Sequence, residues 1–138
     1  MAVTRRMPRI QAVLLPVLRD ALGPDVKVGS WVESIDYRDM PLIYVRRMGG
    51  IALDPNFMDR ATIELTAYGN HGLVQTENLF LDARQVIWDM ADRQVVTPSG
   101  YLHSFRETMG PTQFDSPYDG TWRIQCLIQL GLRPPRNS

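Results

Sequence analysis

The residues that could carry out acid–base or metal chemistry are few and are not arranged for it. His71 falls in an expected turn and His103 in an expected strand, and no carboxylate lies at the i+4 spacing of a metal-binding helix. Structural roles explain both histidines: His71 as a turn residue and His103 as a half-buried strand residue. The single cysteine, Cys126, excludes an internal disulfide and a cysteine-rich zinc site. Because Cys126 shares strand parity with apolar neighbours, we expect a buried structural thiol.

Two acidic stretches and one glycine pair also have simple explanations. Residues 54–59 have too few oxygens in register for a calcium loop and lack its closing glutamate. Asp115 and Asp119 suit loop solubility and turn formation better than an acid–base pair. Gly49-Gly50 has no lysine and serine behind it, which predicts a turn or bulge and not a phosphate cradle. The sequence therefore predicts no catalytic, cofactor-binding or metal-binding residue.

Composition indicates one globular core. The chain has 138 residues, 44% apolar and 22% charged, and its fifteen basic and fifteen acidic residues cancel. Zero net charge argues against wholesale binding to nucleic acid or an anionic membrane, and it permits self-association. No run approaches the ~20 apolar residues of a membrane span. Because the N-terminal segment lacks a signal peptide's apolar block, we expect the chain in the cytosol or in a particle assembled there.

Hydrophobic periodicity predicts the elements that must position any site. Helices are expected over 8–22, with a kink or break at Pro16, and over 73–92. Strands are expected over 26–32, 42–48, 59–68, 101–109 and 121–130, loops over 33–41, 51–58 and 110–120, and an exposed flexible tail over 132–138.

These elements predict a single α+β domain over residues 1–138, with the order α-β-β-β-α-β-β. We expect a mostly antiparallel or mixed sheet of about five strands. Antiparallel pairing is expected among the first three strands and between the last two. Both helices are expected to pack on one face of the sheet.

The long helix carries apolar residues on two sides. Its core stripe consists of Leu73, Phe80, Ala83, Ile87 and Met90. Val74, Leu81 and Trp88 lie well over roughly 90° from the centre of that stripe, at 3.6 residues per turn. An apolar band off the core face is typical of a partner surface. The alternative is that a strand or loop of the same chain covers it.

Arg46 and Arg47 end a predicted strand beside Gly49-Gly50. Successive strand residues point to opposite faces, so only one of the two arginines can face the core side. That arginine must extend to solvent or pair with a carboxylate, such as one from a neighbouring subunit. A solvated strand end is the alternative.

Several motifs together resemble a known family. They are Val-Arg-Arg-Met-Gly-Gly at 45–50, the alternating strand at 61–69, Gly110-Pro111, and the closing strand at 122–128. Over residues 8–133 the pattern resembles the tail terminator, or tail completion, proteins of long, flexible-tailed phages, particularly those of actinobacterial hosts. Pro16 and the C-terminal Leu-Arg-Pro-Pro-Arg segment are not part of that pattern.

The resemblance implies a structural virion protein without catalytic residues or cofactor. Family members form a hexameric ring that caps the tail tube, stops its polymerisation and joins the tail to the head–neck complex. The implied partners are further copies of the chain, the tail tube protein and head–tail connector or stopper proteins. DNA would pass through the lumen without specific binding. The implied location is the tail or neck of the virion, assembled in the host cytoplasm.

A closed ring requires head-to-tail contacts between two different patches. The expected patches include Val74, Leu81, Trp88, Arg46 and Arg47, together with the loops that carry Phe57, Phe114 and Tyr118. Another neck protein, such as a stopper or adaptor, and a tail-tube subunit are the alternatives within the structural class. A small α+β binding domain or enzyme is the alternative outside it.

Overall fold

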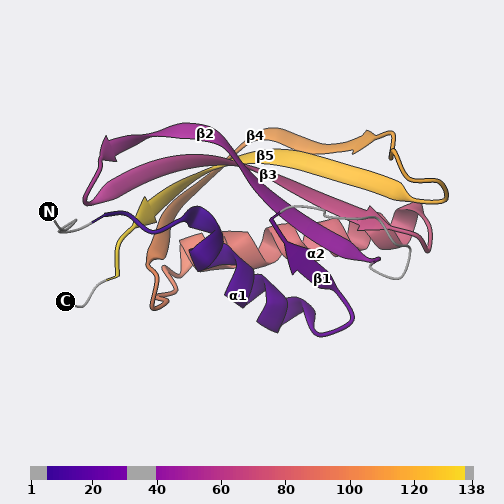
Figure 1. Cartoon of the computed structure of the whole chain (residues 1–138), viewed down its shortest axis with the longest axis horizontal. Helices are drawn as coiled ribbons and strands as arrows, with labels where there is room; N and C mark the ends of the chain where they lie inside the picture. The colour runs from indigo at the N-terminus through magenta and orange to yellow at the C-terminus, as the bar shows by residue number, and fades with distance from the viewer. Residues whose placement is uncertain (1–5, 31–39, 136–138) are drawn as a thin grey trace, which may run out of the picture.

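The computed structural model describes residues 6–30 and 40–135. Its elements are α1 (Ile10–Leu22), β1 (Lys27–Gly29), β2 (Leu42–Asp54), β3 (Met58–Gly69), α2 (Leu73–Asp92), β4 (Tyr101–Phe114) and β5 (Trp122–Arg133). Both helices lie on one face of a mixed five-stranded sheet (Figure 1). The predicted α+β class and the predicted order α-β-β-β-α-β-β are confirmed.

The sheet has the strand order β1-β2-β3-β5-β4, so β4 forms one edge. The pairs β2–β3, β3–β5 and β4–β5 are antiparallel, whereas β1 pairs with β2 in parallel. The expected antiparallel pairing of the first two strands is therefore wrong. Residues 30–41 separate these strands, and about a dozen residues is enough for the crossover that a parallel pair requires.

Two strands continue through residues that were expected to end them. β2 passes through Gly49-Gly50 to Asp54, and β4 passes through Gly110-Pro111 to Phe114. The predicted loops over 51–58 and 110–120 are consequently too long. Bulges explain both cases, because the register shifts between Arg47 and Gly50 and between Met109 and Thr112. Gly50 has φ +97°, and a Cβ there would clash with the carbonyl oxygen of Arg60.

The remaining differences concern element ends. β5 continues to Arg133, with Leu132 and Pro134 buried, so the tail predicted from residue 132 starts too early. α1 is one continuous helix across Pro16, so a helix in two pieces is wrong. The expected loop over 33–41 lies almost wholly outside the described residues, as do residues 31–32 and 136–138.

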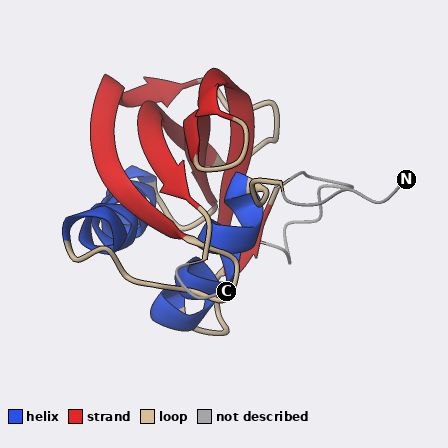
Figure 2. Ribbon diagram, turned by 90° about the vertical axis from the view of Figure 1, so that its left-hand side faces the viewer, coloured by secondary structure: helices blue, strands red, loops and turns tan. Residues whose placement is uncertain are grey.

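The core fills the space between the helices and the inner face of the curved sheet (Figure 2). Alternation along β3 turns Ala61, Ile63, Leu65 and Ala67 towards the helices, and all four are fully buried. The predicted stripe of α2 meets them, with Phe80, Ala83, Ile87 and Met90 buried. α1 contributes Ile10, Val13, Leu14 and Leu18 from beside β1 and β2. Among residues 6–30 and 40–135, no helix covers the opposite face of the sheet, and the surfaces below arise from this one-sided arrangement.

Candidate subunit and partner interface

The apolar band on α2 stays largely outside the core. Val74 is 69% exposed, Leu81 42% and Trp88 45%. The Trp88 ring packs edge-on against Phe105 of β4, with ring centroids 5.2 Å apart and an interplanar angle of 84°. A strand of the same chain therefore covers one side of Trp88. Val74 and Leu81 remain open to solvent.

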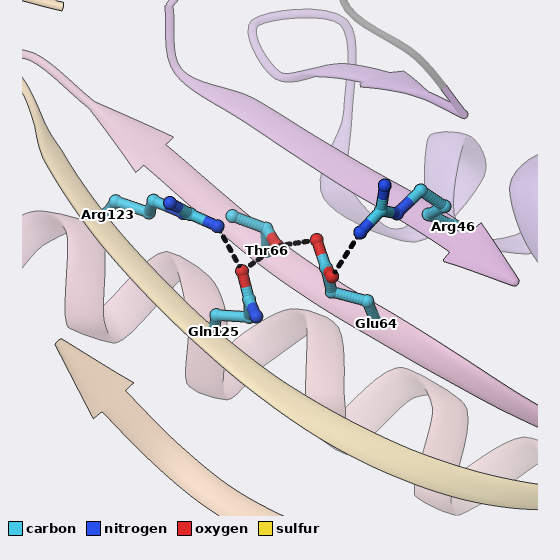
Figure 3. A network of polar contacts seen from close by, with 5 residues as sticks. All are labelled: Arg46, Glu64, Thr66, Arg123 and Gln125. Atoms are coloured by element: carbon cyan, nitrogen blue, oxygen red, sulfur yellow. Dashed lines mark hydrogen bonds and ion pairs between the residues drawn. The ribbon is translucent and has the colours of Figure 1, made fainter. Parts of the chain in front are cut away.

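A chain of polar contacts crosses β2, β3 and β5 on the sheet face that lacks helices (Figure 3). Arg46 Nη2 donates to Glu64 Oε2 at 2.9 Å, and Arg123 Nη2 donates to Gln125 Oε1 at 2.6 Å. The Thr66 hydroxyl lies 3.4 Å from Glu64 Oε1 and 3.3 Å from Gln125 Oε1, and its single proton serves one of them at a time. We call these five residues the open-face network.

The open-face network holds buried polar groups between two arginines. Glu64, Thr66 and Gln125 are nearly or fully buried, although they lie on the face without helices. The hydrogen bond to Glu64 raises the pKa of the Arg46 guanidinium, which is a permanent cation in any case. The network therefore fixes side-chain positions and charge on the sheet surface.

Two of the expected interface aromatics lie at the Arg123 end of this network. The Arg123 guanidinium carbon lies 5.2 Å from the Phe114 ring centroid and 6.0 Å from that of Tyr68. Tyr118 lies over Tyr68, with centroids 5.7 Å apart. Burial raises the pKa of Tyr68. Arg46, Phe114 and Tyr118, which are distant in the sequence, thus belong to one surface.

Arg47 points to the other side of the sheet from Arg46. Its Nη1 and Nη2 atoms donate to the two carboxylate oxygens of Asp59 at 2.6 and 2.9 Å. Asp59 is 5% exposed and shares a side of β3 with the core residues, and its hydrogen bonds raise the pKa of Arg47. Of the two outcomes expected for the core-facing arginine, extension to solvent or pairing with a carboxylate, the structure shows the pairing. The carboxylate belongs to the same chain and not to a neighbouring subunit.

Phe57 lies in the tight turn between β2 and β3, where its N–H donates to the Asp54 carbonyl at 3.1 Å. It is one of four large apolar side chains exposed on the distal half of this hairpin. We call residues 48–57 the hairpin arm; its exposed apolar residues are Met48, Ile51, Leu53 and Phe57. This segment was expected at an interface as a loop, with Phe57 as its named residue; the structure instead shows two paired strands joined by a turn.

Cys126 and His103 both lie in the sheet and have shifted pKa values. Burial raises the pKa of the Cys126 thiol to about 12. The Nε2 atom of His103 lies 2.9 Å from the sulfur of Met58, and burial lowers the pKa of this histidine. Within residues 6–30 and 40–135, no group of three His, Cys, Asp or Glu side chains could hold a metal ion. No helix in the same part of the chain is long and apolar enough to cross a membrane.

The open-face network was missed at the sequence level except for Arg46. A signal was present in β3, where Glu64 and Thr66 alternate with apolar residues and must lie opposite the core face. Their partners come from β5, paired as Thr66 with Gln125 and Tyr68 with Arg123. Since that register depends on long-range strand pairing, the sequence alone could not join these residues.

Comparison with known proteins identifies the family. The model of the family described as "Phage tail termination protein" matches residues 6–138. The chain belongs to this family. It is 47% identical over 137 residues to the "Gene 22 protein" of Mycobacterium phage L5, covering 96% of this chain and 98% of that protein. It is 44% identical over 135 residues to the "Gene 22 protein" of Mycobacterium phage D29, covering 96% and 97% of the two chains.

Among solved structures, the chain is similar to one in the "Virion of native gene transfer agent (GTA) particle". The TM-score is 0.47 and the identity 14%, with 91% of this chain and 87% of that chain covered. The resemblance to tail terminators is confirmed by the family match and the two mycobacteriophage relatives. The family is structural and non-enzymatic, and its members are components of the phage tail.

Proposed function

We propose that this tail termination protein forms a hexameric ring that caps the completed tail tube. In this proposal the ring stops further polymerisation of the tube and joins the tail to the head–neck complex. Its partners are further copies of the chain, the tail tube protein and the head–tail connector or stopper proteins. Family membership over residues 6–138 supports the termination role.

The main support for ring formation is the distribution of exposed apolar side chains. In the part of the chain that the structure describes, ten large apolar residues are exposed. Seven of them lie on the hairpin arm or in the α2 band, which come from different elements. Apolar surface gathered in patches favours burial against a partner. Two different patches on one subunit are what a head-to-tail ring requires.

The sheet face without helices has the charge properties expected of a channel wall past which DNA moves. Arg46 and Arg123 each donate a hydrogen bond to a side chain of the same sheet, so they are less available to bind phosphate. The whole chain has a formal net charge of zero. A conduit that carried many free cations would bind the phosphate backbone through counterion release and hold it. We therefore assign DNA passage, without specific binding, to this proposal.

Adding the purified chain to polymerising tail tube protein tests the proposed function. We expect rings at one end of each tube and tubes that stop growing, both visible by negative-stain electron microscopy. A matched reaction that contains a heat-denatured sample of the chain should give tubes of unlimited length. Tubes that continue to elongate in the presence of intact protein would contradict the proposal. Incorporation of the protein along the tube wall would instead identify a tube subunit.

A further inference from the structure

The sheet face without helices has a second polar region, beyond the open-face network. There Arg60 of β3 lies opposite Gly131 of β5, and Gly131 lies opposite Ser104 of β4. Opposed residues of a sheet point to the same side, with Cβ atoms about 5 Å apart. A Cβ at Gly131 would clash with Ser104 Oγ and His103 Nε2, so both side chains lie over this glycine. Arg60 is four residues from Glu64 on the same strand, and it therefore points to the same side as the network.

Two further arginines flank this position. Arg133 is two residues from Gly131 on β5, and Arg106 is two residues from Ser104 on β4, so both share its side of the sheet. At ~4.8 Å between strands and ~3.4 Å per residue, the Cα atoms of the three arginines lie within roughly 15 Å of one another. We call this region the basic end of the face; its residues are Arg60, His103, Ser104, Arg106 and Arg133.

The positive charge of the basic end is not neutralised by ion pairs. In the part of the chain that the structure describes, none of its three arginines has an ion-pair partner. The carboxylates next to them along the strands are Asp59 and Glu107, and these are paired with Arg47 and Arg84. Because the whole chain has a formal net charge of zero, this gathering of free cations is a local property of one surface.

The basic end and the open-face network therefore differ, although they share one sheet face. In the network, Arg46 and Arg123 each donate a hydrogen bond to a neighbouring side chain. At the basic end, burial and the charges of Arg133 and Arg60 lower the pKa of His103, so both guanidinium groups lie within electrostatic range of its ring. Cations without a partner in their own chain are the ones that can displace counterions from a phosphate backbone.

The side chains of the basic end favour a phosphate backbone over a protein surface. Guanidinium and hydroxyl groups donate hydrogen bonds to phosphate oxygens, and interfaces with DNA are more polar and more positively charged than those between proteins. Seven of the ten exposed large apolar side chains of the described residues lie on the hairpin arm or in the α2 band. The basic end meets the arm at Arg60, which lies opposite Ile51.

We propose that the basic end binds the phosphodiester backbone of DNA, as a sequence-independent contact on the channel wall. Arg60, Arg106 and Arg133 engage phosphate oxygens, and the Ser104 hydroxyl donates a further hydrogen bond. The inference rests on the proposed passage of DNA through the ring, and it adds the place where the DNA is held. Since the arginines of the open-face network are hydrogen-bonded within the sheet, the contact is confined to one end of the wall.

Binding of a fluorescein-labelled DNA duplex, followed by fluorescence anisotropy between about 50 and 200 mM NaCl, tests the site. Arg60→Gln and Arg106→Gln each remove one cation from an exposed position of the basic end. Arg93→Gln is the matched control, because it removes the same charge from an exposed arginine at the end of α2. Circular dichroism and thermal melting check that each variant is folded.

The salt dependence should identify the arginines that contact phosphate. Each such arginine contributes about 0.9 to the slope of log K against log salt concentration. Loss of one of three per subunit should therefore lower the slope by about one third, whether the protein binds as a monomer or as a ring. Arg93→Gln should keep the wild-type slope. Both variants of the basic end should still cap tail tubes, because the site contacts DNA and not a protein partner.

A wild-type chain that does not bind the duplex at about 50 mM NaCl would overturn the site. A wild-type slope for both variants of the basic end, or an equal reduction for Arg93→Gln, would also overturn it. Labelled polyglutamate that binds more tightly than DNA, or loss of capping by the folded variants, would instead place the basic end in a contact with a protein. The wild-type capping assay decides the proposed function separately from the DNA titration.

Discussion

The two flanks of α2 have the same apolar character and different surroundings. Phe80 and Ile87 are fully buried against the sheet, whereas the next residues, Leu81 and Trp88, are 42% and 45% exposed. A rotation of about 100° per residue, which follows from 3.6 residues per turn, accounts for the change. Apolar type alone therefore does not say whether a residue serves the fold or the assembly. Angular position relative to the sheet decides it.

The largest effect should come from the buried flank. Phe80→Ala should lower the free energy of unfolding by about 3–5 kcal/mol, because it leaves a cavity among core residues. Leu81→Ala, one position along, should change it by about 0.5 kcal/mol or less. Urea unfolding followed by circular dichroism measures both values. Equal losses at the two positions would break the distinction between the flanks.

Arg46 and Arg47 show the same contrast on the sheet, between a residue that stabilises the fold and one that lies on the surface. Arg47→Gln should cost about 2–3 kcal/mol of unfolding free energy, since it leaves the buried Asp59 carboxylate without its partner. Arg46→Gln should cost less, about 1 kcal/mol, because Arg46 is half exposed and makes one hydrogen bond to Glu64, where Arg47 makes two to Asp59. Glu64 also keeps its contact with the Thr66 hydroxyl when Arg46 is removed. Chemical denaturation of the two variants beside the wild type gives the comparison. A smaller loss for Arg47→Gln than for Arg46→Gln would contradict the assignment of Arg47 to the fold.

Trp88 is partly packed against its own chain and partly exposed. Its substitution should therefore affect assembly more than stability. Trp88→Ala removes the edge-on contact with Phe105 and should lower the unfolding free energy by about 1 kcal/mol. The circular dichroism of the subunit should remain largely intact, while self-association is lost. Sedimentation velocity measures the second property. Global unfolding of this variant would show that Trp88 belongs to the core.

The smallest effect concerns pH. Burial, together with the charges of Arg133 and Arg60, lowers the pKa of His103 in the folded chain. As pH falls below the ordinary histidine value of about 6.5, the unfolded chain takes up the proton first, so the unfolding free energy should decrease. His103→Gln should reduce this slope in denaturation curves collected across that pH window. An unchanged slope would exclude His103 as its source.

Local patterns in the sequence were enough to predict the elements of the fold. The alternation over 59–68 and the helical stripe from Leu73 predicted β3 and α2 closely. Gly49-Gly50 and Gly110-Pro111 were interpreted as strand ends because glycine and proline usually mark turns. In the structure they are bulges in longer strands. A turn and a bulge have the same local sequence signal here. Only the pairing with the neighbouring strand shows that the strand continues.

The candidate interface could be predicted only in part, because some of its contacts depend on long-range strand pairing. Helical geometry placed Val74, Leu81 and Trp88 off the core face without any tertiary information. The Arg47–Asp59 pair and the contacts of Glu64 with Arg46 join residues 12 and 18 positions apart through strand register. The segment of the hairpin arm was expected at an interface, but as a loop, and only strand pairing shows that Ile51 and Leu53 are exposed on a hairpin.

Electron microscopy of the purified chain, alone and with tail tubes, tests the central claim most directly. The account predicts closed hexameric rings, found free in solution or seated on one end of each tube. A folded chain that gives only monomers in both samples, beside tubes that keep growing, would contradict it.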